Sequence, residues 1–436
     1  MKTYMNGSTK KLFVLVLAFS FPFLAWAHED WNIKNLSVEK TLTNSFVKHE
    51  GAEPYLSMTL NYGPFKEFVD KVDHFTYRPV QSRGEAHITV ITPPEFKDDL
   101  SKFVTIQEIN EIAEKSDIQK SVYKPVCMGK GTAIDGGKFL ENYFIVVESE
   151  NLLNIRKKVA ELYKKRGGSR FDPLHFYPHI TLGFTDHDLF ENSGVIKDAR
   201  SCMKTLHISP KESDVKGLPI ANSSYVARNK TGGAIIRGSA PLNHFNLELM
   251  KKFGISEVII FKNDKAGEVK SELGGLAELG FKKNDVTHIN FDWKDNQNFS
   301  SGCAKIIQGI DLLKLALKNN KKIFFHCTTG EDRTGVLASS YLLSVNKKAD
   351  IKSLFKDEMC SKGYEAGDVD KDKEVVQRIR EGLTKTFLKT AYRIEEAKKA
   401  KKPINEKLCV KDPSDEPKFI AYSAQMDFTC GAKVAK

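Results

Sequence analysis

Two spacings of apolar residues divide this chain of 436 residues into predicted strands and helices. An apolar residue at every second position, or a short apolar block, predicts strands at residues 55–62, 86–91, 143–147, 178–183, 258–261, 286–291 and 323–325. Apolar residues three or four positions apart predict helices at residues 65–72, 102–115, 152–164, 242–253, 303–318, 334–345 and 375–400. Strands and helices alternate in the second half, which predicts an α/β fold with a mostly parallel sheet flanked by helices.

A polar stretch at residues 209–219 predicts a linker between two domains, because it contains Pro210, Gly217 and Pro219. The chain is long enough for two or three domains. We expect a signal segment, a first domain, this linker, a second domain and a C-terminal tail at residues 1–27, 28–208, 209–219, 220–400 and 401–436.

The first segment has the three regions of a secretory signal peptide. Basic residues come first, an apolar core follows at residues 12–24, and Ala25-Trp26-Ala27 is a cleavage site. We expect cleavage before His28 and export to the periplasm or the exterior, with an uncleaved anchor as the alternative. No later stretch has the length of a membrane span, so none is expected after signal removal. The formal net charge of +11 suits an anionic substrate such as a phosphoester, and its lysines are dispersed rather than gathered in one block.

Seven cysteines leave an even six for disulfides if Cys327 is a free nucleophile. Sequence alone allows several pairings of these six. Their grouping along the chain suggests the pairs Cys127–Cys202, Cys303–Cys360 and Cys409–Cys430, the last of which would hold the tail.

The strongest chemical signal lies between the predicted strand at 323–325 and the predicted helix at 334–345. It has the pattern H-C-x-x-G-x-x-R-[ST]-G and consists of His326, Cys327, Thr328, Thr329, Gly330, Glu331, Asp332, Arg333, Thr334 and Gly335. A strand, a tight turn and a helix N-terminus form an anion site, because backbone N–H groups and the helix dipole both favour negative charge. In such a site the Cys327 thiolate can attack phosphorus, and the Arg333 fork suits two phosphoryl oxygens.

This stretch resembles the cysteine-dependent phosphatases, which include the protein tyrosine and dual-specificity phosphatases. The resemblance implies a phosphocysteine intermediate on Cys327 and a phosphoryl group held by Arg333. It implies further substrate contacts from His326, Thr328, Thr329, Gly330, Glu331, Asp332 and Thr334. The substrate would be a phosphorylated protein or a small phosphoester, with no metal or other cofactor; a buried cysteine beside an unrelated arginine is the plainer alternative.

The same resemblance implies a general acid, which is an aspartate on a loop ahead of the cysteine. Asp295 is preferred, because it follows the strand at 286–291 and has polar neighbours. Asp292, next to Trp293, is the alternative, and an ordinary surface turn would explain either residue.

The residues inside the loop bear on the substrate. The D-R-T-G ending is similar to that of bacterial and lipid-directed phosphatases, which often carry a lysine where this chain has Glu331. An acidic residue there disfavours highly phosphorylated inositol rings. We therefore expect phosphotyrosine or phospho-Ser/Thr substrates, with inositol phosphates or phosphoinositides as the alternative.

Two H-x-T patterns lie on predicted strands of the first domain. Since residues i and i+2 share a strand face, His87 points with Thr89, and His179 points with Thr181. If the strands lie side by side, one imidazole can accept a proton and the other can donate one to a leaving oxygen. The hydroxyls can hold non-bridging oxygens, and this chemistry needs no metal.

The pair resembles the two-histidine (2H) phosphoesterase superfamily over roughly residues 50–190. The resemblance implies a two-lobed α+β domain that acts on 2′,3′-cyclic phosphates or 2′-5′ linkages of nucleotides or RNA ends. Alternatives are ordinary strand histidines, or a module that binds phosphate or nucleotide without hydrolysis. Another alternative is a metal site formed from His175, His179, Asp186, His187 or Asp188.

Overall fold

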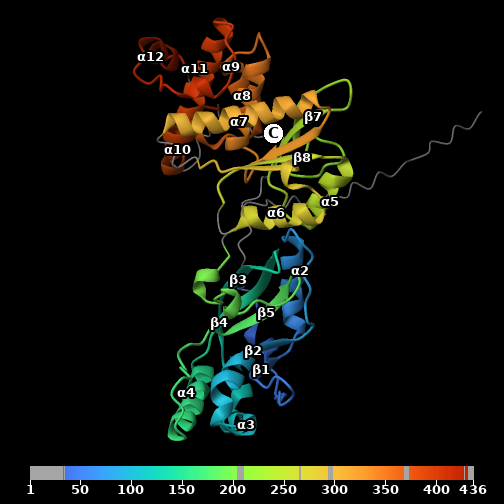
Figure 1. Cartoon of the computed structure of the whole chain (residues 1–436), viewed down its shortest axis with the longest axis vertical. Helices are drawn as coiled ribbons and strands as arrows, with labels where there is room; N and C mark the ends of the chain where they lie inside the picture. The colour runs from blue at the N-terminus through green and yellow to red at the C-terminus, as the bar shows by residue number, and fades with distance from the viewer. Residues whose placement is uncertain are drawn as a thin grey trace, which may run out of the picture.

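A computed structural model gives the fold and describes residues 33, 35–203, 211–264, 267–292, 298–367, 373–426 and 428–430. The expected signal peptide and the preferred acid, Asp295, lie outside these residues. Figure 1 shows two bodies along the long axis, with the N-terminal half in blue and green and the C-terminal half mainly in yellow, orange and red. Within the described residues, no helix combines the length and the apolar character that a membrane crossing requires.

The N-terminal domain contains two small antiparallel sheets. β1 (Leu56–Leu60) pairs with β2 (Ala86–Ile91), and the second sheet has the order β3 (Lys124–Asp135), β4 (Lys138–Glu148) and β5 (His179–Phe184). β2 contacts β5, so the two sheets lie side by side. The helices are α1 (Val38–Thr41), α2 (Gly63–His74), α3 (Ile106–Lys115) and α4 (Glu150–Lys165).

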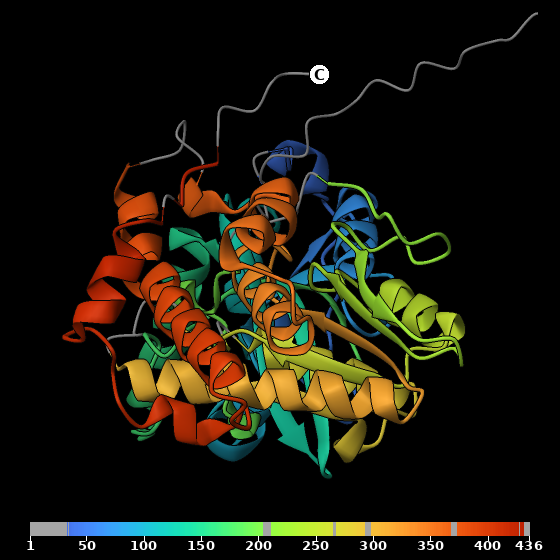
Figure 2. The ribbon, with the colours of Figure 1, turned by 90° about the horizontal axis from the view of Figure 1, so that it is seen from above.

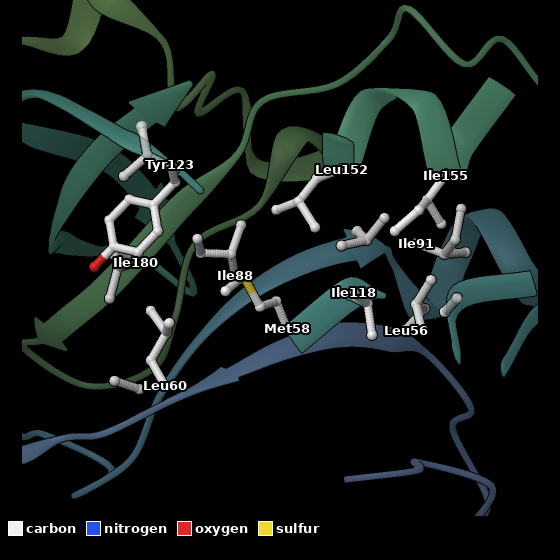
Figure 3. Close-up of a cluster of buried hydrophobic side chains, with 14 of the residues drawn as sticks. Leu56, Met58, Leu60, Ile88, Ile91, Ile118, Tyr123, Leu152, Ile155 and Ile180 are labelled. Carbon is white, nitrogen blue, oxygen red and sulfur yellow. The ribbon is translucent and has the colours of Figure 1, made fainter. Parts of the chain in front are cut away.

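Alternation along β2 and β5 sorts their residues between the core and the surface. Ile88 and Ile180 are fully buried in a cluster that includes Leu152 from α4, as Figure 3 shows. Their neighbours His87 and His179 are half-buried and point the other way. Each fully buried leucine or isoleucine stabilises the domain by about 1.5–3 kcal/mol, so the core fixes the face on which the histidines lie.

The C-terminal domain has one five-stranded sheet. Its order is β6 (Ser224–Arg228), β7 (Ala234–Gly238), β10 (Lys322–His326), β8 (Glu257–Phe261) and β9 (Val286–Ile289). Only β6 runs antiparallel to its neighbour, which confirms the predicted mostly parallel sheet. The central strand is β10, the strand that leads into the cysteine motif.

Helices cover both faces of this sheet. Residues of α7 (Phe299–Lys318), α8 (Asp332–Val345) and α11 (Lys385–Lys399) share one apolar cluster, and residues of α5 (His244–Phe253) and α6 (Glu268–Glu278) share another. Viewed from above in Figure 2, the long α7 crosses the domain beside the red C-terminal helices. The remaining helices are α9 (Ile351–Leu354), α10 (Lys373–Ile379) and α12 (Pro417–Ser423). Val215 and Leu218 of the expected linker are buried in the α5–α6 cluster, so that end of the linker is part of the second domain's core.

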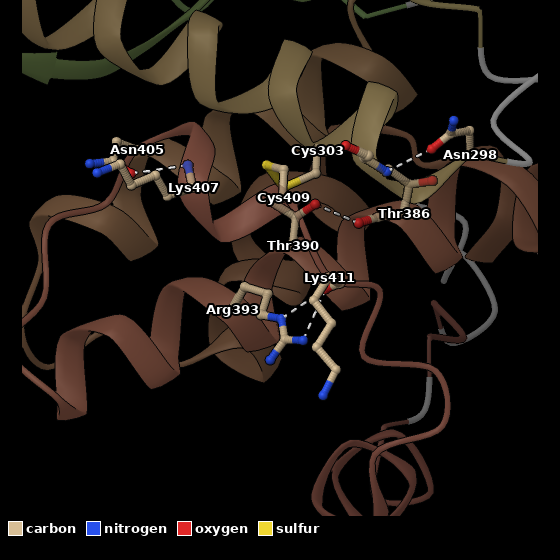
Figure 4. Close-up of a disulfide and its surroundings, with 10 residues drawn as sticks. Asn298, Cys303, Thr386, Thr390, Arg393, Asn405, Lys407, Cys409 and Lys411 are labelled. Atoms are coloured by element: carbon tan, nitrogen blue, oxygen red, sulfur yellow. Dashed lines mark hydrogen bonds between the residues drawn. A yellow bond between two sulfur atoms is a disulfide. The ribbon is translucent and has the colours of Figure 1, made fainter.

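Three disulfides join the six other cysteines, but two of the expected pairs are wrong. Cys127–Cys202 forms as expected, whereas the remaining pairs are Cys303–Cys409 and Cys360–Cys430. Proximity in sequence misleads here because the tail folds back over the domain. The segment Glu406–Cys409 packs against the start of α7, as Figure 4 shows, so each tail cysteine meets a cysteine of the domain body.

Helix α6 joins the two domains. Ser271 donates a hydrogen bond to Glu141 over 2.7 Å, and Glu278 forms an ion pair with Arg78. Lys130 neutralises the buried Glu141 carboxylate. The contact between the domains therefore contains a buried charge pair, and beside it Tyr77 of the first domain packs against the apolar α5–α6 cluster.

Candidate active sites

The first site lies at the carboxyl ends of the parallel strands in the C-terminal domain. The loop at residues 327–331 connects the central strand β10 to α8. Residues after the neighbouring strands meet there: Gly238 ends β7, Asn263 follows β8 and Asp292 follows β9. Parallel sheets bind ligands at this edge, so the topology places the loop where a phosphoryl group can enter.

The loop curls so that its carbonyl groups face away from its centre. Gly330 has φ +74°, and an added Cβ would come within 2.4 Å of the Gly238 carbonyl, so only glycine fits. Behind the loop, the fully buried Arg237 donates to the carbonyl oxygens of Gly330 over 2.8 Å and Glu331 over 3.3 Å. The Asn222 amide also donates to the Gly330 oxygen, over 3.1 Å. With its carbonyls held outside, the loop can turn its amides towards the sulfur.

Cys327 is the free cysteine among the seven, and its thiol is activated by its surroundings. Burial raises its pKa, but the Arg333 charge, the Thr334 hydroxyl and the amides of Thr334 and Gly330 outweigh burial and lower the pKa from 9.0 to about 6. The Thr334 amide belongs to the first turn of α8, where the helix dipole also favours an anion. The thiolate is therefore the main form of Cys327 at neutral pH.

Arg333 connects the loop to the strand ends around it. One terminal nitrogen donates to Asn263 Oδ1 over 2.9 Å, and the other donates to Thr328 Oγ1 over 3.1 Å. The Asn263 amide in turn donates to Asp292 Oδ2 over 3.4 Å. Asp292 is thus linked to the loop arginine through a single side chain, whereas Asp295 lies outside the described residues.

His326 supports the loop from below. Its side chain is fully buried, with Nδ1 2.9 Å from the Cys327 carbonyl oxygen and Nε2 2.7 Å from Oε1 of the fully buried Glu272. Because both ring nitrogens face protein atoms, His326 can act on a ligand only through the loop that it holds.

The other predicted loop contacts divide between the interior and the rim. Glu331 is buried, and its carboxylate packs against Gly363. The Asp332 carboxylate accepts a hydrogen bond from the Glu365 amide over 2.8 Å. Thr328 and Thr329 are half-buried at the rim. The Glu331 and Asp332 side chains, which were predicted to contact the substrate, instead contact other parts of the protein.

The second site lies where β2 and β5 meet. His87 and Thr89 are half-buried on one face of β2, and His179 and Thr181 are half-buried on one face of β5. A small cavity draws on both strands, and it is lined by Arg83, Glu85, His87 and Thr181. The structure therefore brings the two H-x-T patterns to one place.

The His179 ring is held at both nitrogens. Nδ1 lies 2.8 Å from the Tyr177 carbonyl oxygen, so Nδ1 carries the proton and Nε2 is the acceptor. Nε2 lies 3.1 Å from Nζ of Lys197, which is also 2.9 Å from Asp188 Oδ1. Burial and the Lys197 charge lower the pKa of His179 to about 3.

His87 has the opposite electrostatic neighbour. Its Nδ1 lies 3.8 Å from a Glu85 carboxylate oxygen. Burial lowers the pKa of His87, and the Glu85 charge opposes that change. The Tyr55 ring lies 6.0 Å from the His87 ring, and His49 stacks on Tyr55 at 3.9 Å. The charges beside His87 are mixed, because Glu85 raises its pKa while Arg83 lowers it, and the pKa values of both imidazoles are lowered overall.

The residues of the alternative metal site do not gather. His175 pairs with Glu191, and His187 pairs with Asp135. Across the part of the chain that the structure describes, no three His, Cys, Asp or Glu residues are grouped as metal ligands.

Several supporting residues were not predicted. Arg237 had a usable signal, because a charged residue inside a buried apolar strand needs a buried partner. Asn222 and Asn263 lie in loops without a motif. Lys197 is one of many lysines in the chain and had no distinguishing signal in the sequence.

Comparison with known proteins supports the first domain directly. Residues 54–190 match the family model "Swiss Army Knife, 2H phosphoesterase domain", which confirms the resemblance expected from the two histidines. The chain therefore contains a phosphoesterase domain. No curated protein has a significantly matching sequence.

Several solved structures are similar to part of the chain. TpbA of P. aeruginosa is 16% identical with TM-score 0.26, and the match covers 37% of this chain and 88% of TpbA. PTPMT1 is 12% identical with TM-score 0.27, and the match covers 41% of this chain and 98% of PTPMT1. The core catalytic domain of the PP-IP phosphatase SIW14 from S. cerevisiae is 15% identical with TM-score 0.26. The match covers 48% of this chain and 98% of that domain. The case for phosphatase chemistry in the C-terminal domain rests on the loop itself.

Proposed function

We propose that this chain is an exported phosphoester hydrolase with two sites, and that its C-terminal domain hydrolyses phosphomonoesters through a phosphocysteine on Cys327. One observation carries the proposal. The sulfur lies at the N-terminus of α8 with the Arg333 charge, the Thr334 hydroxyl and two loop amides around it, and its pKa falls to about 6. This is the environment that a thiolate nucleophile requires.

In the proposed reaction, the Cys327 thiolate attacks phosphorus while Arg333 and the loop amides hold the non-bridging oxygens. The leaving oxygen takes a proton from the general acid. Water then attacks the phosphocysteine, the same aspartate takes the water's proton, and phosphate leaves from the regenerated thiolate. The Thr334 hydroxyl stabilises the sulfur as it leaves.

Asp295 remains the proposed acid, and Asp292 is its competitor. Asp292 has a specific observation in its favour, since Asn263 links it to Arg333. Comparing Asp295→Asn with Asp292→Asn on two aryl phosphates separates them. The true acid is required for a poor leaving group such as phenol, and it matters little for p-nitrophenol, which leaves without a proton.

Phosphotyrosine or phospho-Ser/Thr is the proposed substrate. Inositol phosphates and phosphoinositides are a second candidate, because the Glu331 carboxylate packs inward against Gly363 and obstructs the rim less than its sequence position suggested. A phosphate-release screen of phosphopeptides, nucleotides, inositol phosphates and phosphoinositide vesicles decides between these classes.

The decisive variant is Cys327→Ser. It should abolish phosphate release while the protein still binds vanadate or tungstate, because the loop amides and Arg333 remain. Activity near that of the unaltered protein in this variant would remove the phosphatase proposal.

For the first domain, we propose metal-independent hydrolysis of 2′,3′-cyclic or 2′-5′ phosphodiesters by His87 and His179, with Thr89 and Thr181 on the non-bridging oxygens. The match over residues 54–190 and the cavity that His87 and Thr181 line together support this proposal. Assays of a 2′,3′-cyclic nucleotide with the full chain, His87→Ala and His179→Ala test it. Nucleotide binding without turnover would favour the non-catalytic binding module.

Export fits the three disulfides, which form and persist in oxidising compartments. The test is N-terminal sequencing of the protein recovered from the periplasm or medium, which should begin at His28. Recovery only from the reducing cytoplasm with an intact Met1 would contradict export.

A further inference from the structure

Residues 358–367, which we call the supporting segment, lie against the loop that connects β10 to α8. The segment holds the two side chains that fix the loop carbonyls. Arg237 donates to the Glu358 carbonyl and forms an ion pair with the Glu358 carboxylate over 3.3 Å. The Asn222 amide, which donates to a loop carbonyl, also donates to the Lys362 carbonyl over 3.2 Å. The position of the supporting segment therefore helps to set the position of both side chains.

The supporting segment also contacts the loop and α8 directly. A Cβ on Gly363 would come within 2.6 Å of the Glu331 carboxylate, so the segment passes close to the end of the loop. The Glu365 amide donates to the Asp332 carboxylate over 2.8 Å, at the first residue of α8. Because these contacts are close, a shift of the segment would disturb the turn whose amides face the sulfur.

One residue of the C-terminal tail fastens the supporting segment at two points. Cys430 forms a disulfide with Cys360, and its amide donates to the Gly367 carbonyl over 2.8 Å. The approach is close, because a Cβ on Gly367 would overlap the Cys430 sulfur. The Phe428 ring, two residues earlier, packs edge-on against Phe355 at 4.7 Å. The end of the tail is thus packed on the domain where it holds the segment.

Other contacts hold the same segment, and they differ in strength. Met359 and Tyr364 are buried in the apolar core. The chain between these two residues is half-buried or exposed. Lys362 in this part pairs with Asp214, which is 71% exposed, so the pair contributes little. The covalent bridge at Cys360 is a stronger restraint on this part of the segment than the exposed ion pair.

We propose that the Cys360–Cys430 disulfide is a positioning element of the phosphatase site, because it holds the supporting segment where Arg237 and Asn222 keep the loop carbonyls turned outwards. This inference rests on the proposed phosphatase function of the C-terminal domain. It adds that full activity requires a bridge from the far end of the chain. Such a requirement suits an exported protein, since disulfides form and persist in oxidising compartments.

The test measures the acidity of Cys327 and needs no turnover. In Cys360→Ser combined with Cys430→Ser, iodoacetamide should label Cys327 alone, because the other four cysteines stay bridged. The pH midpoint of labelling should rise by about one unit, and labelling at pH 6 should slow about fivefold, since a looser loop stabilises the thiolate less. An unchanged midpoint in this folded double-serine variant overturns the inference.

Cys303→Ser combined with Cys409→Ser is the matched control. The two bridges join cysteines 106 and 70 positions apart, so the two variants should lose similar amounts of stability. The control bridge fastens the turn at Glu406–Cys409 to α7 rather than to the supporting segment. Its removal should therefore leave the midpoint near pH 6. An equal rise in both variants would indicate a general loosening of the domain and would overturn the specific role of the first bridge.

Gly367→Ala covers the case in which the double-serine variant does not fold. Its Cβ would overlap the Cys430 sulfur, so the tail and the supporting segment must move apart there while the bridge remains. The labelling midpoint should rise by a smaller amount than in the double-serine variant. If the double-serine variant is unfolded, an unchanged midpoint in Gly367→Ala overturns the inference by itself.

Phosphate release from p-nitrophenyl phosphate separates this inference from the proposed function. If the unaltered protein is active, the double-serine variant should lose about tenfold in kcat/KM, because its loop is no longer held in place. Full kcat/KM in that variant would contradict the positioning role. A shifted midpoint in a protein that releases no phosphate supports the role of the bridge in fixing the loop, and overturns the proposed phosphatase function instead.

Discussion

The acidity of Cys327 gives the most direct test of the loop at residues 327–331. The other six cysteines form disulfides, so iodoacetamide under non-reducing conditions should label Cys327 alone. Because the thiolate is the reacting form, the alkylation rate should follow its fraction and rise with a midpoint near pH 6. The assay is the rate of carbamidomethylation at this one position, followed by mass spectrometry across a pH series.

The size of the effect follows from the structure. The difference between 9.0 and about 6 corresponds to about 4 kcal/mol in favour of the thiolate. Burial opposes that stabilisation, and the Arg333 charge is the largest contribution in its favour. Arg333→Met should therefore move the midpoint well towards 9, and it should slow alkylation at pH 7 by about tenfold or more. Thr334→Val removes one hydrogen bond and should give a smaller change in the same direction.

The lowered pKa of Cys327 also determines how the stability of the fold should change with pH. The folded-state pKa is below the unfolded value, so the thiolate stabilises the fold; this contribution is complete above about pH 9 and is lost as the pH falls through about 6. Cys327→Ser provides the control, because it should show no labelling and should lack this pH dependence of unfolding. A midpoint near 9 in the unaltered protein, or the same midpoint in Arg333→Met, would refute the electrostatic account of the loop.

Three further predictions concern the framework. Gly330→Ala should lower phosphatase kcat/KM by about 100-fold or more, since its Cβ would meet backbone atoms of Gly238. Normal activity in a phosphate-release assay would contradict this close approach of the Gly330 and Gly238 backbones. Replacing Cys303 and Cys409 together by serine should lower the free energy of unfolding by about 2–5 kcal/mol, measured by urea denaturation, because their bridge closes a long loop; an unchanged midpoint would show that the bridge is dispensable. Arg156→Met should lower the free energy of unfolding by about 3–5 kcal/mol, because this guanidinium is only 1% exposed and binds a glutamate and four carbonyl oxygens. A loss below about 1 kcal/mol in urea denaturation would contradict this prediction.

Local patterns in the sequence predicted the parts of the fold that depend on neighbours along the chain. Alternation located β2 and β5 and the face on which His87 and His179 lie, because strand residues two apart share a face. β3 was missed, because Gly129, Lys130 and Gly131 interrupt the apolar alternation that the prediction required. The helix expected at 375–400 exists, but a π-helical segment at Arg380–Thr384 divides it.

Contacts between distant segments could not be predicted in the same way. The pairing of Cys360 with Cys430 depends on a tail that returns across the domain, and no residue spacing records that return. Asn222 supports the loop from more than a hundred positions away, with its own backbone in the left-handed region at φ +54°. Both cases are decided by packing in three dimensions, so the motif indicated the proposed nucleophile but not the residues that support its loop.

Helix α6 shows why the two domains should be treated as one structural unit, although their apolar cores are separate. Ser271 binds the buried Glu141 of the first domain, and the next residue, Glu272, lies against His326 below the loop at residues 327–331. A Cβ on Gly275 would come within 2.6 Å of the Tyr77 carbonyl oxygen, so the helix also meets first-domain backbone directly. Because α6 contacts both neighbours through buried polar groups, separating the domains would expose a carboxylate network on one side and loosen the support of the loop on the other. The first domain thus helps to fix the helix against which the Cys327 loop is built, whatever reaction each site carries out.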